Sequence, residues 1–155
     1  MTPPSLFILS IGNTLRGDDG IGPWIGQQLS RLPLRQTEVS FAHDLSGDWL
    51  EIMIRFERTL LVDARVGEGE DIRFGPFAPD DAITKRSSHY LDPADIPGIL
   101  QALFPGQPAL YTCSVPGYDF NFSEALSPQG HTRATEALHI ITEWLTREGY
   151  LESIP

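Results

Sequence analysis

The stretch LFILSIGNTLRGDDGIG, from Leu6 to Gly22, decides the fold class predicted for this chain. Its first part, Leu6 to Gly12, is a short apolar run ended by glycine, which indicates a buried strand. Apolar residues then recur at helical spacing from Gly20 to Leu32. The glycine-rich turn that carries the adjacent acids Asp18 and Asp19 therefore lies between a strand and a helix.

In nucleotide-binding proteins a turn of this kind binds phosphate through backbone N–H groups, the helix N-terminus and often a lysine. Here Asp18 and Asp19 stand where a phosphate loop has its lysine and hydroxyl residue. Two carboxylates repel phosphate, so this turn is better suited to bind a cation or a proton. A plainer interpretation is that an aspartate caps the following helix, which is worth about 1 kcal/mol. We accept this for one of the two acids, but it does not require both.

The composition predicts one globular domain over residues 1–155, with a hydrophobic fraction of 41%. A net charge of −10 opposes nonspecific binding to nucleic acid or to an anionic membrane. The sequence has neither a signal-like N-terminus nor an apolar stretch long enough to span a bilayer, so we expect a cytoplasmic protein without a membrane partner. The one cysteine, Cys113, excludes an internal disulfide and a Cys-rich zinc site. Its neighbours ALYTCSV predict a buried strand residue rather than a nucleophile.

The rest of the chain alternates apolar runs with amphipathic segments, which predicts a three-layer α/β domain with a mostly parallel twisted sheet flanked by helices. Further strands are expected at 37–43, 59–64, 72–77 and 109–115, and further helices at 47–56, 92–103 and 127–145. In such sheets ligands bind beyond the carboxyl ends of the strands.

Four acids are predicted to reach this edge of the sheet: Asp18, Asp19, Asp44 and Asp63. Two aspartates together with His89, in the loop KRSSHYLDP, would make a divalent-metal set with open positions for water or substrate. His43 competes with His89, but if the strand continues that far, its side chain should point to the opposite face from Asp44. His131 and His139 are expected to be surface or packing residues of the last helix, away from the acids.

Other hydrolytic sites fit poorly. The chain has no G-x-S-x-G nucleophile elbow and no H-E-x-x-H helix. Ser87 and Ser88 are sequence neighbours of His89, which is not how a catalytic triad is built. Two of the acids could instead form an aspartic dyad with one raised pKa, provided that their carboxyl groups come within hydrogen-bonding distance. Spacing along the sequence leaves the metal site and the dyad both open.

Four motifs resemble one known family. ILSIGNTLRGDDGIG, LLVDA, SSH and LSPQ occur in this order over nearly the whole chain, and together they resemble the hydrogenase maturation proteases. These endopeptidases remove a C-terminal extension from the large subunit of nickel–iron hydrogenases. The resemblance implies a twisted sheet flanked by helices. It also implies that Asp19 of the GDDG turn, Asp63 of LVDA and His89 of SSH contact a metal.

By this resemblance the metal is nickel carried by the immature substrate, and the partner is the large-subunit precursor. The family often has a Gly-Gly-Thr-like turn after a further acid near the second strand, whereas this chain has HDLSGDW, so Asp44 stays only an additional candidate. Nickel could polarise the scissile carbonyl or a water, or the carboxylates could act alone. The alternative functions are a resident-metal peptidase or amidase on small substrates and a non-catalytic metal-binding accessory protein. We expect Asp19 and Asp63 to be exposed, so that alanine at either position leaves folding largely intact.

Overall fold

The computed structural model describes residues 2–67, 69–77 and 109–153. Within this part of the chain, five strands form one sheet in the order β2-β1-β3-β5-β4. The strands are β1 (Leu6–Ile11), β2 (Thr37–Ala42), β3 (Arg58–Val66), β4 (Arg73–Pro76) and β5 (Ala109–Gly117). The helices are the 3-10 turn η1 (Gly17–Gly20), α1 (Ile21–Ser30), α2 (Asp48–Met53) and α4 (Pro128–Arg147). Only β4 pairs antiparallel, so the predicted α/β fold with a mostly parallel sheet is confirmed.

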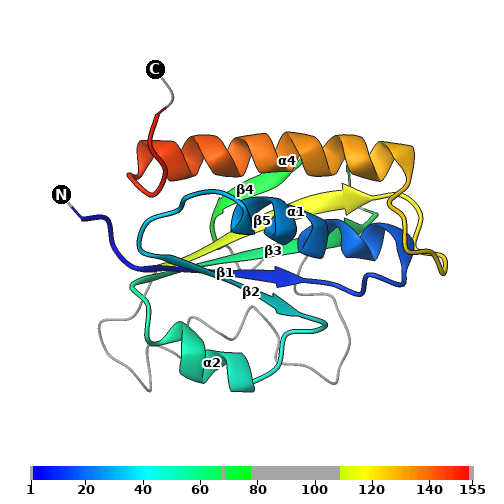
Figure 1. The fold of residues 1–155 in the computed structure, drawn as a ribbon. Coiled ribbons are helices and arrows are strands. Elements are labelled where there is room, and N and C mark those ends of the chain that lie inside the picture. The colour runs from blue at the N-terminus through cyan, green and yellow to red at the C-terminus, as the bar shows by residue number, and fades with distance from the viewer. Residues whose placement is uncertain (1, 68, 78–108, 154–155) are drawn as a thin grey trace.

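Helices cover both faces of the sheet. Figure 1 shows α1 and α4 on one face and α2 on the other. Alternate residues of β1 therefore enter two apolar cores: Ile8 packs on the side of α1 and α4, and Phe7 and Leu9 pack with Met53 of α2. All six residues of β1 are buried. This explains why five of its six residues are apolar, with Ser10 as the exception, because a strand covered on both faces has no side that tolerates solvent.

The order of the strands creates a switch point between β1 and β3. The chain leaves β1 through α1 to reach β2 on one side, and then passes through α2 to reach β3 on the other side of β1. The two connections diverge beyond the carboxyl ends of β1 and β3. Open α/β sheets bind ligands at such a point. The residues that follow β1, and those at the same level of β3, are therefore the candidates for a ligand-binding site.

Several predicted boundaries are wrong. β2 ends at Ala42 rather than at residue 43, and α2 covers residues 48–53 instead of 47–56. β3 continues to Val66, past the predicted end at residue 64, because it keeps pairing with β5 as far as Gly117. Asp63 consequently lies inside β3 and not at its end. It is still at the carboxyl edge of β1, whose pairing with β3 stops at Ser10 and Val62.

The last helix begins as predicted. Ser127 is the N-cap of α4, its Oγ accepts a hydrogen bond of 2.9 Å from the N–H of Gly130, and Pro128 occupies the first helical position. The helix predicted at 92–103 and the loop with His89 lie outside the described residues. In the part of the chain that the structure describes, no helix has the length and hydropathy to cross a membrane.

Candidate active site

Asp19 lies in the turn that follows β1, and Asp63 lies in β3; these two strands flank the switch point. Asp19 lies in η1, directly after β1, and η1 contacts β3. The contact is close because Gly22 has no side chain: a Cβ there would lie 2.3 Å from the carbonyl oxygen of Ile11 and 2.8 Å from that of Val62. The start of α1 is thus pressed onto the ends of both strands. This packing brings the turn with Asp19 to the level of Asp63.

The turn holds Asp19 in a defined orientation. Its Oδ2 accepts a hydrogen bond of 2.8 Å from the N–H of Asn13, and its side chain is 6% exposed. Gly12 packs against the backbone of the same residue, since a Cβ on Gly12 would lie 1.9 Å from the Asp19 carbonyl oxygen. Gly12 also has a positive φ of 154°. The GNTLRGDDG turn therefore closes on itself around this carboxylate.

Asp63 lies in β3 opposite Ser114 of β5 and is 2% exposed. Its Oδ1 accepts a hydrogen bond of 2.7 Å from the N–H of Ala64. The expectation that Asp19 and Asp63 are exposed is therefore wrong, because the sheet and the turn bury both. Removing a buried carboxylate leaves its hydrogen-bond donors unsatisfied, so alanine at either position is expected to cost stability.

Arg65 is a charged neighbour that the sequence analysis missed. It is 3% exposed and lies two residues after Asp63, on the same face of β3. Its Nη1 donates to the Ser114 Oγ at 3.0 Å, and its Nη2 donates to the Asp71 carbonyl oxygen at 2.6 Å. A buried guanidinium beside a buried carboxylate offsets part of the cost of burying both charges. The sequence LLVDARV could have indicated this pair, because Asp63 and Arg65 are oppositely charged residues two positions apart in an apolar run.

Asp18 has a structural role. Its Oδ2 accepts hydrogen bonds from the N–H of Tyr118 (2.7 Å), the N–H of Asp119 (3.0 Å) and the Oγ of Ser127 (2.7 Å), while Oδ1 accepts from the Ser127 N–H (2.8 Å). Burial raises the pKa of Asp18, but these hydrogen bonds outweigh it and hold the pKa below its ordinary value. A carboxylate that is ionised and surrounded by donors does not suit a dyad that shares a proton.

The prediction that one of the two acids caps the following helix is wrong. One of the two acids does stabilise a helix terminus, but the helix is α4 and not the adjacent α1. The N-cap of α1, Gly20, receives no side-chain hydrogen bond. Asp18 instead lies at the N-terminus of α4, where it contacts Ser127 and where a Cβ on Gly130 would come within 2.2 Å of its Oδ1.

Asp44 follows β2 at the same edge of the sheet, one strand away from the switch point. β2 is parallel to β1, and the Gly12 N–H donates to the Ala42 carbonyl oxygen at 2.9 Å. The Nδ1 of His43 lies 2.9 Å from Oδ2 of Asp44. The prediction that these two side chains point to opposite faces required the strand to include them, and this condition is not met because β2 ends at Ala42.

The structure describes two of the three predicted metal ligands. Asp19 and Asp63, the two predicted carboxylate ligands, both lie near the switch point, whereas His89 lies outside the described residues; metal binding by all three stays a prediction. Across residues 2–67, 69–77 and 109–153, no group of three or more His, Cys, Asp or Glu side chains is arranged to hold a metal ion.

The other histidines and the cysteine have packing or surface roles. His131 packs edge-on against Trp24, with ring centroids 5.2 Å apart. His139 is exposed, and its Nε2 lies 3.0 Å from Oε1 of Glu143. The expectation that both histidines lie away from the acids is wrong for His131, because α4 begins at the acid-bearing edge. Cys113 is fully buried, as predicted; burial raises the pKa of its thiol to about 12 although the charge of Arg65 opposes this.

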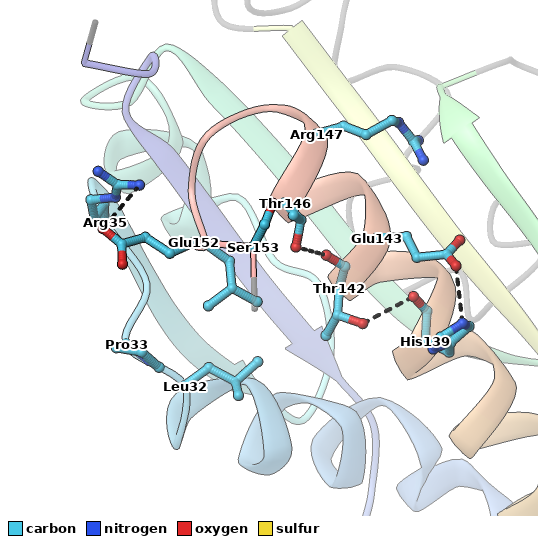
Figure 2. A pocket seen from close by; sticks show the side chains of 11 residues that line it. Leu32, Pro33, Arg35, His139, Thr142, Glu143, Thr146, Arg147, Glu152 and Ser153 are labelled. Carbon is cyan, nitrogen blue, oxygen red and sulfur yellow. Dashed lines mark hydrogen bonds and ion pairs between the residues drawn. The ribbon is translucent and has the colours of Figure 1, made fainter. Parts of the chain in front are cut away.

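A cavity of about 1410 Å³ lies elsewhere, between the end of α1, the last turns of α4 and the C-terminal segment (Figure 2). Arg35 lines the cavity, and its N–H donates to the carbonyl oxygen of Tyr150. The next residue, Gln36, accepts a hydrogen bond from the N–H of Leu6, the first residue of β1. The cavity therefore lies at the end of the sheet where β1 begins. Its ion pair between Arg35 and Glu152 is exposed, and such pairs contribute little. The charged side chains that line this cavity are therefore interpreted as ordinary solvent-exposed residues.

Neither a protein-family model nor a curated protein sequence matches this chain. Solved structures do match. The chain aligns with the hydrogenase maturating endopeptidase HybD from E. coli at a TM-score of 0.79 and 21% identity, over 96% of this chain and 94% of that one. It also aligns with the [NiFe] hydrogenase maturation protease HycI from Thermococcus kodakarensis at a TM-score of 0.71 and 17% identity, covering 92% and 94% of the two chains. The chain has the fold of the hydrogenase maturation proteases.

A third alignment, with an endopeptidase from Escherichia coli, has a TM-score of 0.76 and 23% identity and covers 100% of this chain and 98% of that one. The hydrogenase maturation protease fold thus spans nearly the whole length of each chain. Identities this low establish the fold alone. The chemistry must therefore be inferred from the residues that this chain places at the edge of β1 and β3.

Proposed function

We propose that this protein is an endopeptidase that removes the C-terminal extension of a nickel–iron hydrogenase large-subunit precursor. The observation that carries the proposal is the position of Asp19 and Asp63. Both are buried carboxylates. Asp19 lies in the turn after β1 and Asp63 in β3, on either side of the switch point, and the fold is that of hydrogenase maturation proteases.

In this proposal Asp19, Asp63 and His89 recognise nickel that the precursor carries. Two carboxylates and one imidazole suit a divalent first-row metal. A set of three protein donors also leaves coordination positions for groups of the precursor itself. The metal is then part of the substrate, and its presence signals that the precursor is ready to be cut.

The proposed division of roles follows from the hydrogen bonds of the acids. Nickel bound to the precursor supplies Lewis-acid polarisation at the scissile carbonyl or at a water. A carboxylate must then accept the proton of the attacking water. Asp18 is unsuited because both its oxygens accept hydrogen bonds from the loop before α4 and its pKa is lowered. The task therefore falls to Asp19 or Asp63.

Intact-mass spectrometry of a large-subunit precursor tests the proposal. The wild type should shorten the nickel-loaded precursor and leave the metal-free precursor unchanged. Asp19→Asn and Asp63→Asn should lower the rate by about 100-fold or more, since metal ligation or proton transfer is lost. Asparagine keeps the shape of the side chain in these buried positions, and His89→Ala tests the third donor. Asp48→Asn is the matched control, because it makes the same change at an exposed acid in α2.

Cleavage that proceeds equally without nickel, or that survives both asparagine substitutions, would contradict this mechanism. Two other outcomes would support the alternative functions. Retention of one zinc per chain together with hydrolysis of small amides would indicate a resident-metal peptidase. Binding to the nickel-loaded precursor without any loss of mass would indicate an accessory protein.

A further inference from the structure

Two exposed apolar side chains, Leu15 and Phe122, stand beside the candidate active site. Leu15 is 44% exposed and belongs to the same turn as Asp19. Phe122 is 85% exposed and belongs to the loop between β5 and α4, which Asp18 holds in place. Leaving a phenyl ring in water forgoes about 1.5–3 kcal/mol of burial. Adjacent exposed apolar groups at the edge of a polar site are typical of an interaction surface.

The backbones that carry these two side chains are bonded to each other. The N–H of Ser123 donates to the carbonyl oxygen of Leu15 at 2.9 Å, and the N–H of Gly17 donates to the carbonyl oxygen of Ser123 at 2.8 Å. A β-bridge also joins Arg16 to Ser123. We call residues 15–17 and 121–123 together the apolar ledge.

The ledge is fixed in shape. Gly17 has a φ of 54°, and a Cβ there would lie 2.4 Å from the carbonyl oxygen of Asp119, so the two loops approach as closely as glycine permits. The N–H of Asp18 adds a hydrogen bond of 2.7 Å to the same carbonyl oxygen. A surface that is rigid before binding loses little conformational entropy when a partner arrives.

The charges around the ledge indicate which partner fits. Arg16 is exposed, but Asp119 and Glu124 are exposed on the neighbouring loop. The buried Asp19 adds a further acid in the same turn as Leu15. The whole chain carries a net charge of −10. Complementary charge favours a basic partner segment, and the ledge itself favours apolar side chains.

We propose that the apolar ledge binds the stretch of the hydrogenase large-subunit precursor next to the scissile bond, an extended segment with apolar and basic side chains. This rests on the proposed function. Leu15 and Asp19 lie in one compact turn, whose residues Asn13, Arg16 and Asp19 are linked by backbone hydrogen bonds of 3.0–3.1 Å. An extended peptide covers about 10 Å in three residues. A segment held on the ledge therefore presents a bond a few residues away to the acids.

The test compares a ledge variant with a control variant on the nickel-loaded precursor. The ledge variant is Leu15→Asp combined with Phe122→Asp. The control is Phe41→Asp on the edge strand β2, because Phe41 is 45% exposed, as Leu15 is, but faces α1 near Gly26. Biolayer interferometry gives the Kd for the precursor, mass spectrometry gives kcat and KM, and thermal unfolding verifies that each variant is folded.

The ledge variant should raise Kd and KM at least about 10-fold, as loss of an interface anchor does, and should keep kcat within about 2-fold. Phe41→Asp should leave all three values near those of the wild type. Unchanged KM and Kd in the ledge variant, a fall confined to kcat, or an equal loss in Phe41→Asp would overturn the ledge while the proposed function stands. A wild type that binds without cutting, with binding lost in the ledge variant, would support the ledge and overturn the endopeptidase assignment. A wild type that neither binds nor cuts would overturn both.

Discussion

Asp18 and Asp19 are adjacent in the sequence, but their carboxylates are held by different parts of the chain. Asp19 is bonded by Asn13 of its own turn, at the edge of the sheet where β1 ends. Asp18 is bonded by three residues of the segment before α4, and each of its oxygens has a donor. The first carboxylate therefore stays at the switch point, and the second fastens the loop that borders it. Fixing this loop also fixes the backbone that Asp19 depends on.

Replacing Asp18 by asparagine should lower the free energy of unfolding by about 2 kcal/mol at pH 7, because an NH₂ group then faces N–H and O–H donors. The pKa of Asp18 is lowered by folding, so the unfolded chain binds this proton more tightly than the folded protein. The stabilisation is therefore complete above the ordinary aspartate pKa of about 3.9 and is lost as the pH falls through the lower folded value. Urea unfolding of both proteins from pH 7 to pH 3 measures this.

The difference between wild type and Asp18→Asn should shrink as the pH falls through that range. Asp48→Asn, at an exposed acid, should show no comparable loss at any pH. A difference for Asp18→Asn that is the same at pH 7 and pH 3 would mean that the charge of the carboxylate is not what stabilises the loop.

Only part of this residue-level result could be predicted from the sequence. The position of Asp19 follows from local pattern, since an apolar strand and a helix bracket the turn. The partners of Asp18 do not, because they lie 100 or more positions away along the chain. Burial of both Asp19 and Asp63 was likewise missed, since it depends on how the turn and the neighbouring strands pack.

At the scale of elements, β3 shows how pairing changes a boundary. Its apolar run stops at Arg65, so sequence pattern ends the strand near Ala64. In the structure β5 pairs with β3 up to Val66 and Gly117. Arg65 stays in the sheet because its Nη1 and Nη2 donate to Ser114 Oγ and to three backbone carbonyl oxygens, those of Ser114, Gly69 and Asp71. The tertiary partner overrides the local pattern. This extension also places Asp63 and Arg65 together on one buried face.

The junction of α1 with the sheet offers a paired test of two glycines. Gly22→Ala should lower the free energy of unfolding by about 3 kcal/mol or more, because its Cβ would lie 2.3 Å and 2.8 Å from two backbone oxygens that cannot move independently. Gly20→Ala is the control: the nearest atoms, in Thr14 and Leu126, are 3.5 Å and 3.7 Å away and φ is −78°. It should change stability by less than about 1 kcal/mol.

Urea unfolding of the two variants decides between a packing effect and a backbone effect. Equal losses in Gly20→Ala and Gly22→Ala would show that the flexibility of the glycines, and not the close approach of α1 to β1 and β3, determines their effect. A loss confined to Gly22→Ala would support the contact that brings Asp19 to the level of Asp63.

At the scale of the whole molecule, the sequence predicts the class of fold but not the order of its strands. Alternating strands and helices indicate parallel pairing and helices on both faces. They do not say that β3 lies beside β1 and that β5 follows it outward. The switch point is a product of this order. The acids could be assigned to one edge of the sheet from sequence, but the two strands that flank the site could be identified only from the structure.

Cys113 reports on the integrity of this sheet. It lies in β5 between Val62 of β3 and Phe74 of β4, is fully buried, and has a thiol pKa that burial raises to about 12. An ordinary cysteine has a pKa of about 8.5, so the folded protein should hold about 3,000-fold less thiolate near neutral pH. Labelling by Ellman's reagent should therefore be slow in the native protein and should accelerate in parallel with unfolding in urea.

The same experiment bears on catalysis, because the sequence contains one cysteine. Cys113→Ser should show no labelling, and native protein treated with a thiol reagent should shorten the hydrogenase precursor at the untreated rate. Rapid stoichiometric labelling of the native protein, with loss of cleavage, would instead make Cys113 a reactive nucleophile and would contradict its place in the core. The carboxylates at the switch point are the groups that remain for the reaction when the thiol is closed off in this way, so resistance of the activity to thiol reagents is what a site built on Asp19 and Asp63 requires.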